Sequence, residues 1–211
     1  QLYDRQPIEH PIGRALAEAI KRKSLARERF DAMIDGRMRD IHDQTPETFA
    51  DLLDYLSNTS AQLFRLAASA LGNDDPSLDE AAKHAGLAWA LVGIIRAVPF
   101  HAGQGRLYLP LDLLRDAGIT PDEAVHGGGV PGLAAVVERL AQEAGTHIAA
   151  ARRLAPRVSP RILPAFLPVR LARGYLKAIA RSRFDPFALG PPPRPMRRLL
   201  SLAAGQLMRR F

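Results

Sequence analysis

One segment of this 211-residue chain constrains its fold more than any other, because it combines helical spacing of apolar residues with small residues on several sides. Between Ser77 and Pro99, alanine or glycine occupies positions 81, 85, 86, 90 and 93. Without bulky side chains at these positions, neighbouring helices can approach closely. Ser77 is suited to cap the helix at its start, and Pro99 is expected to stop it. The pattern predicts a helix that packs closely against other helices.

The composition extends this prediction to the whole chain. Alanine and leucine dominate the apolar residues, aromatic residues make up only 6%, and the β-branched runs typical of strands are nearly absent. We therefore expect an all-α fold, and a chain of this length suits a single domain. The absence of cysteine from the sequence excludes disulfides, cysteine-ligated zinc, iron–sulfur clusters and thiol nucleophiles.

Capping and turn residues divide the chain into further elements. Thr45 and Pro46 are suited to the cap and first turn of a long helix. Helices are expected over residues 12–23, 25–42, 46–71, 77–99, 130–154 and 160–181, with a short helical piece over 112–116. A glycine hinge is expected at 127–129, a proline-rich linker over 190–195 and an amphipathic stretch over 196–211. The predicted organisation is a helical domain over 1–189, followed by a linker and a basic amphipathic helix over 190–211.

Positive charge is concentrated toward the C-terminal end of the sequence. From Thr146 onward, 14 Arg or Lys residues face one acid, Asp185, so this part carries +13 and leaves −6 for the rest of the +7 chain. Such a basic region suits anionic lipid, an acidic protein or nucleic acid, or is simply solvated. Nucleic acid is disfavoured, because few aromatic residues are interleaved with the cations and no recognised binding module is present.

The final stretch, 196–211, has an apolar face with arginines at both ends. Arg197, Arg198, Arg209 and Arg210 flank that face, a pattern that suits the interface of an anionic membrane. Packing of the same face onto the domain is the alternative. No uninterrupted apolar run reaches the ~20 residues of a spanning helix, so we expect no transmembrane helix. Because the sequence begins with glutamine, we expect the natural start to lie upstream.

Two aspartates form a weak metal signal. Asp35 and Asp40 lie five residues apart, about 140° around a helix. Magnesium-binding carboxylates generally lie three or four residues apart, with a second acidic helix opposite. The alternative is that these aspartates are solvated acids balanced by Arg37 and Arg39. His101 is a lone loop histidine, which is more typical of a hydrogen-bonding residue than of a catalyst.

Common hydrolase and nucleotide-binding motifs are missing from the sequence. It has no H-x-x-x-H pair and no serine in a G-x-S-x-G context. The glycines at 103 and 105 follow no predicted strand and precede no Lys-Ser or Lys-Thr, so a phosphate-binding loop is excluded.

The segment 93–110 resembles a metal-binding motif whose ligands are replaced. In squalene and phytoene synthases this segment reads roughly N-x-x-R-D-x-x-x-D-x-x-x-G-R-x-Y-L-P, and the Asn and both Asp face a magnesium–diphosphate cluster. Arg96 and the run 105–110 match that pattern at the same spacing, which fixes the register. The three ligand positions are instead occupied by Gly93, Ala97 and His101.

Residues 30–72 and 84–118 thus resemble the squalene/phytoene synthase family, in which an acidic I-[DE]-G-x-x-x-D segment precedes a helix ending in L-G and then an R-x-Y-L-P loop. The stretches 57–59, 95–101 and 165–168 are similar to one branch of that family. This branch contains the mitochondrial respiratory complex I assembly factor, and its second aspartate motif is also degraded.

The resemblance implies an isoprenoid-synthase-like helical bundle. In catalytic members it implies head-to-head condensation of two prenyl diphosphates with Mg²⁺. The first acidic helix of the family would precede the part matching residues 1–13, so the resemblance implies that this chain lacks the N-terminal helices. Asp35 and Asp40 match acidic family positions and are the candidates for residual metal or diphosphate binding. The loop surface beside the altered metal site is expected to contain Arg96, His101, Arg106 and Tyr108.

Three hypotheses follow. The first is a non-catalytic, membrane-associated assembly factor for respiratory complex I, which needs no cofactor. Its partners would be a complex I subunit or assembly intermediate, an anionic membrane surface and a prenyl lipid. The second is a prenyl transferase that uses farnesyl or geranylgeranyl diphosphate and holds Mg²⁺ through Asp35 and Asp40. The third is a purely lipid-binding module.

The expected location follows from the residue usage. Arginine greatly outnumbers lysine and alanine is abundant, which is typical of a bacterium of high genomic GC content. We therefore expect a cytoplasmic protein peripheral to the inner membrane, or one on the mitochondrial matrix side if the source is eukaryotic.

Overall fold

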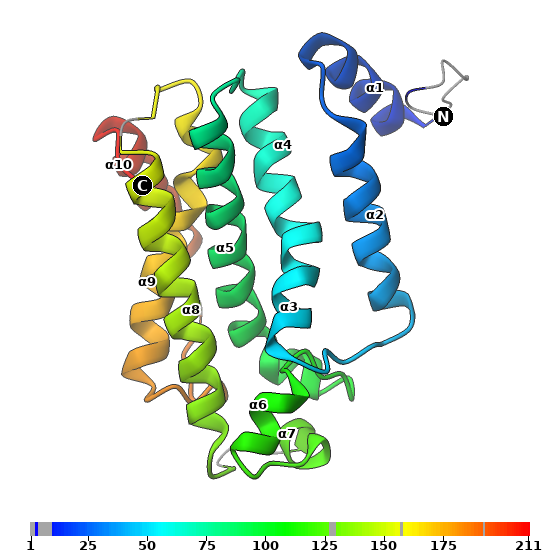
Figure 1. Cartoon of the computed structure of the whole chain (residues 1–211). Helices are drawn as coiled ribbons and strands as arrows, with labels where there is room; N and C mark the ends of the chain where they lie inside the picture. Colours follow the sequence, from blue (N-terminus) through cyan, green and yellow to red (C-terminus); the bar gives the residue numbers. More distant parts are fainter. Residues whose placement is uncertain (1–2, 4–9, 127–129, 157, 192) are drawn as a thin grey trace.

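The computed structural model describes residues 3, 10–126, 130–156, 158–191 and 193–211. Within this part of the chain the regular structure is helical and no strand occurs, which confirms the all-α prediction (Figure 1). The expected glycine hinge at 127–129 lies outside the described residues. In chain order the elements are α1 (Pro11–Lys23), α2 (Arg27–Ile41), α3 (Phe49–Leu56), η1 (Ser57–Ala61), α4 (Gln62–Ala70), α5 (Pro76–Ala102), α6 (Leu111–Asp116), α7 (Pro121–His126), α8 (Leu133–Leu154), η2 (Leu163–Ala165), α9 (Leu167–Arg181) and α10 (Pro195–Leu207).

Helix α5 is the central element of the bundle. It contacts α3, α4, α7, α8 and α9, and Figure 1 shows it between α4 on one side and α8 and α9 on the other. Four of the five small residues predicted to allow close packing are buried, namely Ala81, Ala85, Gly86 and Ala90, whereas Gly93 is exposed. Gly86 is the closest contact, since a Cβ atom added there would lie 2.6 Å from the Cα of Ala61. The absence of a side chain at this position is therefore required by the packing.

The predicted helix over 46–71 is interrupted by a π-helical turn, η1, between α3 and α4. Inside η1, the buried hydroxyl of Thr59 donates to the Tyr55 carbonyl oxygen at 2.7 Å. Such wider turns are often found at functional sites. The predicted start at Pro46 is wrong, because the capping box forms between Thr48 and Asp51 and α3 begins at Phe49.

The two predicted ends of the α5 segment also differ from the structure. Asp75 caps the helix by accepting hydrogen bonds from the backbone and hydroxyl of Ser77, so Ser77 lies inside the first turn. Pro99 does not stop the helix, which continues to Ala102. The carbonyl oxygen of Pro99 still accepts a hydrogen bond from the Gly103 amide at 3.1 Å. A proline so near the helix end removes only one backbone donor and leaves the last turn closed.

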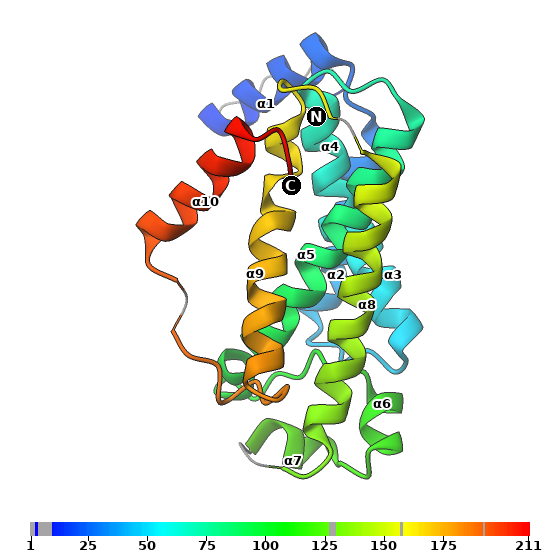
Figure 2. The ribbon, with the colours of Figure 1, turned by 90° about the vertical axis from the view of Figure 1, so that its left-hand side faces the viewer.

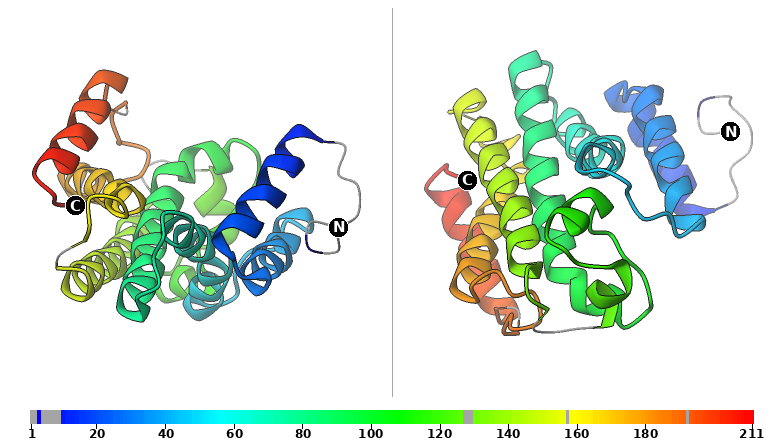
Figure 3. Two further views of the ribbon diagram at one scale, coloured as in Figure 1. Left: turned by 90° about the horizontal axis from the view of Figure 1, so that it is seen from above. Right: turned by 60° about the horizontal axis from the view of Figure 1, so that its bottom comes forward.

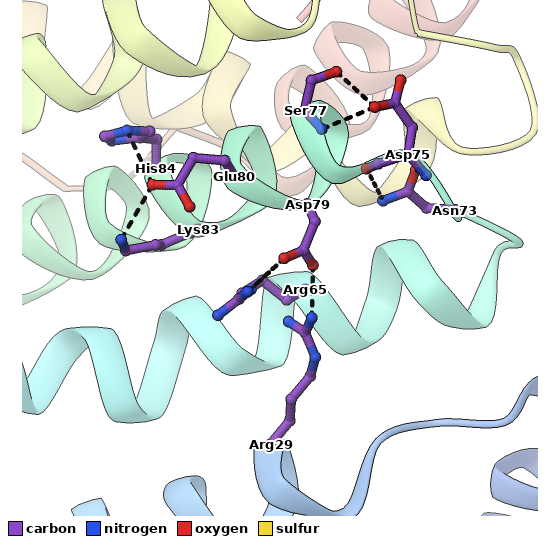
Figure 4. Close-up of polar contacts among 9 residues, drawn as sticks. All are labelled: Arg29, Arg65, Asn73, Asp75, Ser77, Asp79, Glu80, Lys83 and His84. Atoms are coloured by element: carbon purple, nitrogen blue, oxygen red, sulfur yellow. Dashed lines mark hydrogen bonds and ion pairs between the residues drawn. The ribbon is translucent and has the colours of Figure 1, made fainter.

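An acidic side chain on α5 ties α2 to the bundle. Asp79 accepts hydrogen bonds from Arg65 on α4 at 2.9 Å and from Arg29 on α2 at 2.9 Å, as Figure 4 shows. Burial alone would raise the pKa of Asp79. The hydrogen bonds and positive charges of the two arginines outweigh burial and lower this pKa below its usual range. Asp79 thus joins three helices through charged contacts.

The C-terminal third forms the opposite side of the bundle. The predicted helices over 130–154 and 160–181 begin later than expected, at Leu133 and Leu167, the second after the short 3₁₀ helix η2. Helix α10 packs on α9. Figures 2 and 3 show that α1 and α10 project toward the same side of the molecule, away from the row formed by the other long helices.

Within the described part of the chain, α5 is also a helix long and apolar enough to cross a membrane by length and composition. The sequence argument against a spanning helix relied on interruptions such as Arg96 and Pro99, and α5 runs through both residues. Half of its most apolar stretch is buried inside the protein. Its contacts on several sides account for its apolar surface.

We expect Gly86→Ala to lower the melting temperature, because the new Cβ would approach the Ala61 backbone and overpacking costs about 1–3 kcal/mol. Gly93→Ala on the same helix is the matched control, since a Cβ there would meet nothing within 4 Å. That control is expected to stabilise the protein by about 0.5–1 kcal/mol. Thermal unfolding followed by circular dichroism measures both changes. Equal melting temperatures of the Gly86→Ala and Gly93→Ala variants would contradict the close approach of α5 to the backbone at Gly86.

Candidate functional site

A hollow of about 260 Å³ lies at the segment that resembles a metal motif. Four of the residues singled out in the sequence line it: Gly93, Ala97, His101 and Tyr108. The other walls come from α2, α3 and the π-helix η1. The structure therefore brings the altered ligand positions together with residues far away in the sequence.

Asp40 is the acid at this site. Its carboxylate accepts hydrogen bonds from the Tyr55 hydroxyl at 2.9 Å, from the Tyr108 hydroxyl at 3.2 Å and from Nη1 of Arg37 at 2.8 Å. Both tyrosines bond to Oδ1 of Asp40 and Arg37 bonds to Oδ2, and the Tyr55 hydroxyl also lies 3.1 Å from Oδ2. Nη1 of Arg37 also donates to the Tyr55 hydroxyl at 2.8 Å. The charge and both oxygens of Asp40 are thus satisfied by side chains.

Both tyrosines are held in the form that donates these bonds. Burial, the largest effect, raises the pKa of Tyr55. The positive charge of Arg37 opposes this rise, whereas the hydrogen bond and charge of Asp40 add to it. Burial and then the negative charge of Asp40 raise the pKa of Tyr108. At neutral pH both phenols therefore carry their protons and donate to Asp40.

His101 faces the same cluster from the end of α5. The centre of its ring lies 4.6 Å from that of Tyr108, and burial followed by the charge of Arg106 lowers its pKa despite the opposing effect of Asp40. The imidazole is therefore neutral at physiological pH. Its Nδ1 atom is buried and has no hydrogen-bond partner among the described residues. This atom is therefore a buried polar group that the surrounding side chains leave unsatisfied.

Four other predicted residues are absent from the lining of this hollow. Asp40 is one of them, although Tyr55 and Tyr108, to which it is bonded, do line the hollow. Asp35 is exposed on α2, although it shares the acidic segment with Asp40. Arg96 points toward α9, where its guanidinium lies 3.9 Å from the centre of the Tyr175 ring. Arg106 forms an ion pair with Asp43 at 2.8 Å and lines a different hollow, of about 620 Å³.

The side chains at the site do not fit a magnesium–diphosphate cluster. Mg²⁺ prefers an octahedral set of oxygen ligands, often carboxylates together with substrate phosphates. Here the nearest acid, Asp40, is already bonded to Arg37 and two tyrosines, and the facing positions on α5 carry no carboxylate. Among the described residues, no group of three or more His, Cys, Asp or Glu side chains could hold a metal ion.

Sequence reasoning missed several residues of the site, above all Tyr55, Trp89 and the binding role of Arg37. Tyr55 interrupts an otherwise aliphatic helix face, and a buried tyrosine usually finds a partner for its hydroxyl. That signal indicated a polar contact but could not name Asp40, which lies on another helix.

A second polar cluster joins α5 to α8. The Nδ1 atoms of His84 and His147 lie 2.7 Å apart, and Glu80 and Glu143 lie near their outer nitrogens at 3.7 and 3.6 Å. Figure 4 shows His84 beside Glu80 and Lys83. Burial lowers the pKa of both histidines, and the positive charge of His84 lowers that of His147 further. The pair is therefore expected to be neutral, with one Nδ1 donating to the other.

Solved structures identify the class of protein. A squalene synthase from Alicyclobacillus acidocaldarius superposes with a TM-score of 0.77 and 25% sequence identity, over 84% of this chain and 68% of that protein. A dehydrosqualene synthase in complex with a ligand gives a TM-score of 0.78 at 20% identity, over 96% of this chain and 72% of its own. The fold is that of the isoprenoid-synthase-like helical bundle, as predicted, with a metal motif altered at three positions.

The sequence comparison places the chain within this class. Residues 1–201 match the squalene/phytoene synthase family, and the chain belongs to that family. Assembly factor 6 of NADH dehydrogenase (ubiquinone) complex I from Rattus norvegicus is 31% identical over 181 residues, which are 86% of this chain and 54% of the relative. Presqualene diphosphate synthase of Rhodopseudomonas palustris is 32% identical over 138 residues, or 65% and 50%. The chain spans about half the length of these relatives. The predicted family and its assembly-factor branch are confirmed.

We expect Asp40→Asn to destabilise the protein by about 2 kcal/mol, because hydrogen bonds to a charged group contribute about 1.5–3 kcal/mol. Asp35→Asn is the matched control on the same helix and should change the free energy of unfolding by less than about 0.5 kcal/mol. Urea unfolding monitored by circular dichroism compares the two variants. Similar losses of unfolding free energy in the two variants would show that the bonds from Tyr55 and Tyr108 to Asp40 do not stabilise the fold.

We expect the melting temperature to be lower at pH 5.5 than at pH 7.5. The folded protein holds His84 and His147 neutral, whereas the unfolded chain protonates histidine below a pKa of about 6.5. Their contribution to stability is therefore complete above about pH 6.5 and is lost as the pH falls. The double variant His84→Gln/His147→Gln should weaken this pH dependence, and His126→Gln, at a histidine whose side chain is 74% exposed, should leave it intact. An unchanged pH profile in the double variant would refute this assignment.

Proposed function

We propose that this protein is a non-catalytic member of the squalene/phytoene synthase family that assists assembly of respiratory complex I at a membrane. The relatives named as complex I assembly factors support the assembly role. One structural observation carries the non-catalytic part. The carboxylate of Asp40 is bonded to Arg37, Tyr55 and Tyr108, where catalytic members would need ligands for Mg²⁺.

The chemistry explains why this arrangement opposes catalysis. Ionisation of an allylic diphosphate needs strong positive charge at the leaving group, which the family supplies through Mg²⁺. Here Arg37 is partly neutralised by its ion pair with Asp40, and the positions facing it are Gly93, Ala97 and a neutral His101. We therefore propose that the protein uses no resident Mg²⁺ or other cofactor.

The hollow keeps features that suit a ligand without suiting catalysis. Its apolar lining comes from Leu56 on α3 and from Ala90 and Ile94 on α5, and the ring of His101 lines the hollow as well. A prenyl lipid is the ligand class that we propose for it. The partner protein that we propose is a complex I subunit or assembly intermediate. The location is the cytoplasmic face of a bacterial inner membrane, or the matrix side of the mitochondrial one.

A head-to-head prenyl transferase is the second candidate function. It is favoured by the 32% identity to presqualene diphosphate synthase of Rhodopseudomonas palustris and by the intact run from Gly105 to Pro110. This candidate requires Asp40 to release its side-chain partners and bind Mg²⁺ together with Asp35. The exposed position of Asp35, outside the lining of the hollow, disfavours it.

Pyrophosphate release separates the two candidates. We expect none when the purified protein is given farnesyl or geranylgeranyl diphosphate with Mg²⁺, beside the Alicyclobacillus acidocaldarius squalene synthase as an active control. We also expect Mg²⁺ to leave the melting temperature unchanged, since no carboxylate set receives the ion. Pyrophosphate release together with a condensed product would overturn the non-catalytic assignment.

The assembly role has its own test in a strain that lacks the gene. We expect less assembled complex I on native gels and lower NADH:quinone activity in its membranes, and restoration of both by the wild-type gene. A triple variant, Arg37→Ala/Tyr55→Phe/His101→Ala, should restore them less well if the hollow takes part. Normal complex I in the deletion strain would refute the assembly role.

A further inference from the structure

The first half of α10 stands away from the protein body. Every residue from Pro195 to Leu200 is exposed. Figure 2 shows this end of α10 apart from α9, whereas the other end of the helix returns to the bundle. A helix held at one end presents most of its surface to the surroundings.

The face of α10 that packs on the protein is small and polar. A Cβ added to Gly205 would lie 2.8 Å from Cδ2 of Leu167 on α9, so the helices approach closely there. Nε of Arg170 donates to the Ser201 hydroxyl at 3.2 Å, and the Gln206 side-chain amide donates to the Pro160 carbonyl at 3.1 Å. These contacts fix which face of α10 is turned inward.

The apolar face is therefore turned outward. Four large side chains are 60–84% exposed: Met196, Leu199, Leu200 and Leu207. Together with exposed Ala203 they form the apolar stripe, which covers about 100° of the helix surface at 100° per residue. Packing of the apolar face onto the domain, one alternative from the sequence, holds only for the chain end, where Phe211 is buried with its ring centre 5.0 Å from that of Phe166. An amphipathic helix that packs its polar face inward presents its apolar face to an external partner.

Arginines lie at both ends of the apolar stripe along the helix axis. Arg194, Arg197 and Arg198 are exposed at its first turns, and Arg209 and Arg210 are exposed after its last. Arg209 and Arg210 also line a hollow of about 370 Å³ together with Arg152 and Arg153, and none of its lining residues is acidic.

The positive charge at this end is concentrated enough to affect a neighbouring residue. Burial and then the charges of Arg152 and Arg170 lower the pKa of Arg173 on α9. From residue 146 to the end of the sequence, Asp185 is the only acid available to balance these cations. Anions from outside the chain would relieve this repulsion.

We propose that α10 docks this protein on an anionic lipid bilayer. The helix lies in the plane of the interface, the apolar stripe enters the outer edge of the acyl region, and the arginines bind headgroup phosphates. Long arginine side chains reach the headgroups while their stems lie along apolar surface. A bilayer fits better than the groove of a protein partner, because the cations lie at both ends of the stripe and follow no pattern that a specific acidic site would match. This inference rests on the membrane location in the proposed function and assigns it to α10.

Vesicle flotation with the purified chain tests the docking. We expect binding to vesicles of phosphatidylcholine with phosphatidylglycerol, little binding to phosphatidylcholine alone, and weaker binding as salt rises. Leu199→Ser/Leu200→Ser should reduce binding about ten-fold or more, since two leucines lose their apolar contact. Arg197→Ala/Arg198→Ala should reduce it about ten-fold and weaken the salt dependence.

Two control variants match these changes elsewhere on the surface. The variant Ile34→Ser/Ile41→Ser replaces two apolar side chains of α2 that are 63% and 69% exposed. The variant Arg14→Ala/Arg115→Ala removes two positive charges from exposed positions. Both should bind vesicles like the wild type. Circular dichroism confirms that each variant is folded.

Several outcomes would overturn the proposal. They are a folded wild type that stays free of anionic vesicles, equal binding to neutral vesicles, or unchanged binding by the Leu199→Ser/Leu200→Ser variant. If instead the wild type forms a concentration-dependent dimer that this variant abolishes, and no vesicle is bound, the stripe contacts a second copy of the chain. These vesicles contain no complex I subunit, so failure here concerns docking, whereas complex I levels in the deletion strain test the assembly role.

Discussion

The contact between Gly86 of α5 and the backbone at Ala61 determines how the rest of the bundle is arranged. Because Gly86 has no side chain, α5 lies directly against the π-helical turn η1. That turn follows Tyr55 on α3, and η1 also contacts α2, which carries Asp40. A larger residue at position 86 would separate the two walls of the hollow. Close packing at one glycine therefore sets the geometry of the site.

In the proposed non-catalytic role, the same walls explain how the fold is stable without a metal cluster. A half-buried carboxylate is stabilised by hydrogen bonds and a counter-charge, and Asp40 receives them from Arg37, Tyr55 and Tyr108. On the opposite helix, Gly93 and Ala97 add no charge that would need a counter-ion. The loss of acids on α5 and the satisfaction of Asp40 on α2 are consistent with each other.

The sequence predicted the long helices, the fold class and the altered ligand positions, since each depends on local spacing or on a motif with a fixed register. It did not predict the helix start at Phe49, the π-helical turn or the continuation of α5 through Pro99, because capping and packing decide these among similar local candidates. Arg96 was assigned to the site by its neighbours in sequence. One residue step turns a side chain about 100° around a helix, and this places Arg96 against Tyr175 instead. The pairing of Asp40 with Arg37 on the same helix agrees with the alternative drawn from the sequence, whereas the bonds from Tyr55 and Tyr108 were not predictable, because they come from other segments of the chain.

In the proposed role without Mg²⁺, the bonds to Asp40 also make the protein independent of its ionic surroundings in one respect. A site that neutralises its acid with a metal ion is complete only when the cell supplies that ion at sufficient concentration. Here the neutralising groups are part of the chain and are present in a fixed ratio of one set per molecule. The shape of this region is therefore determined at folding and does not vary with the magnesium level of the compartment. A partner that recognises this region would bind it equally well in magnesium-poor and magnesium-rich cells.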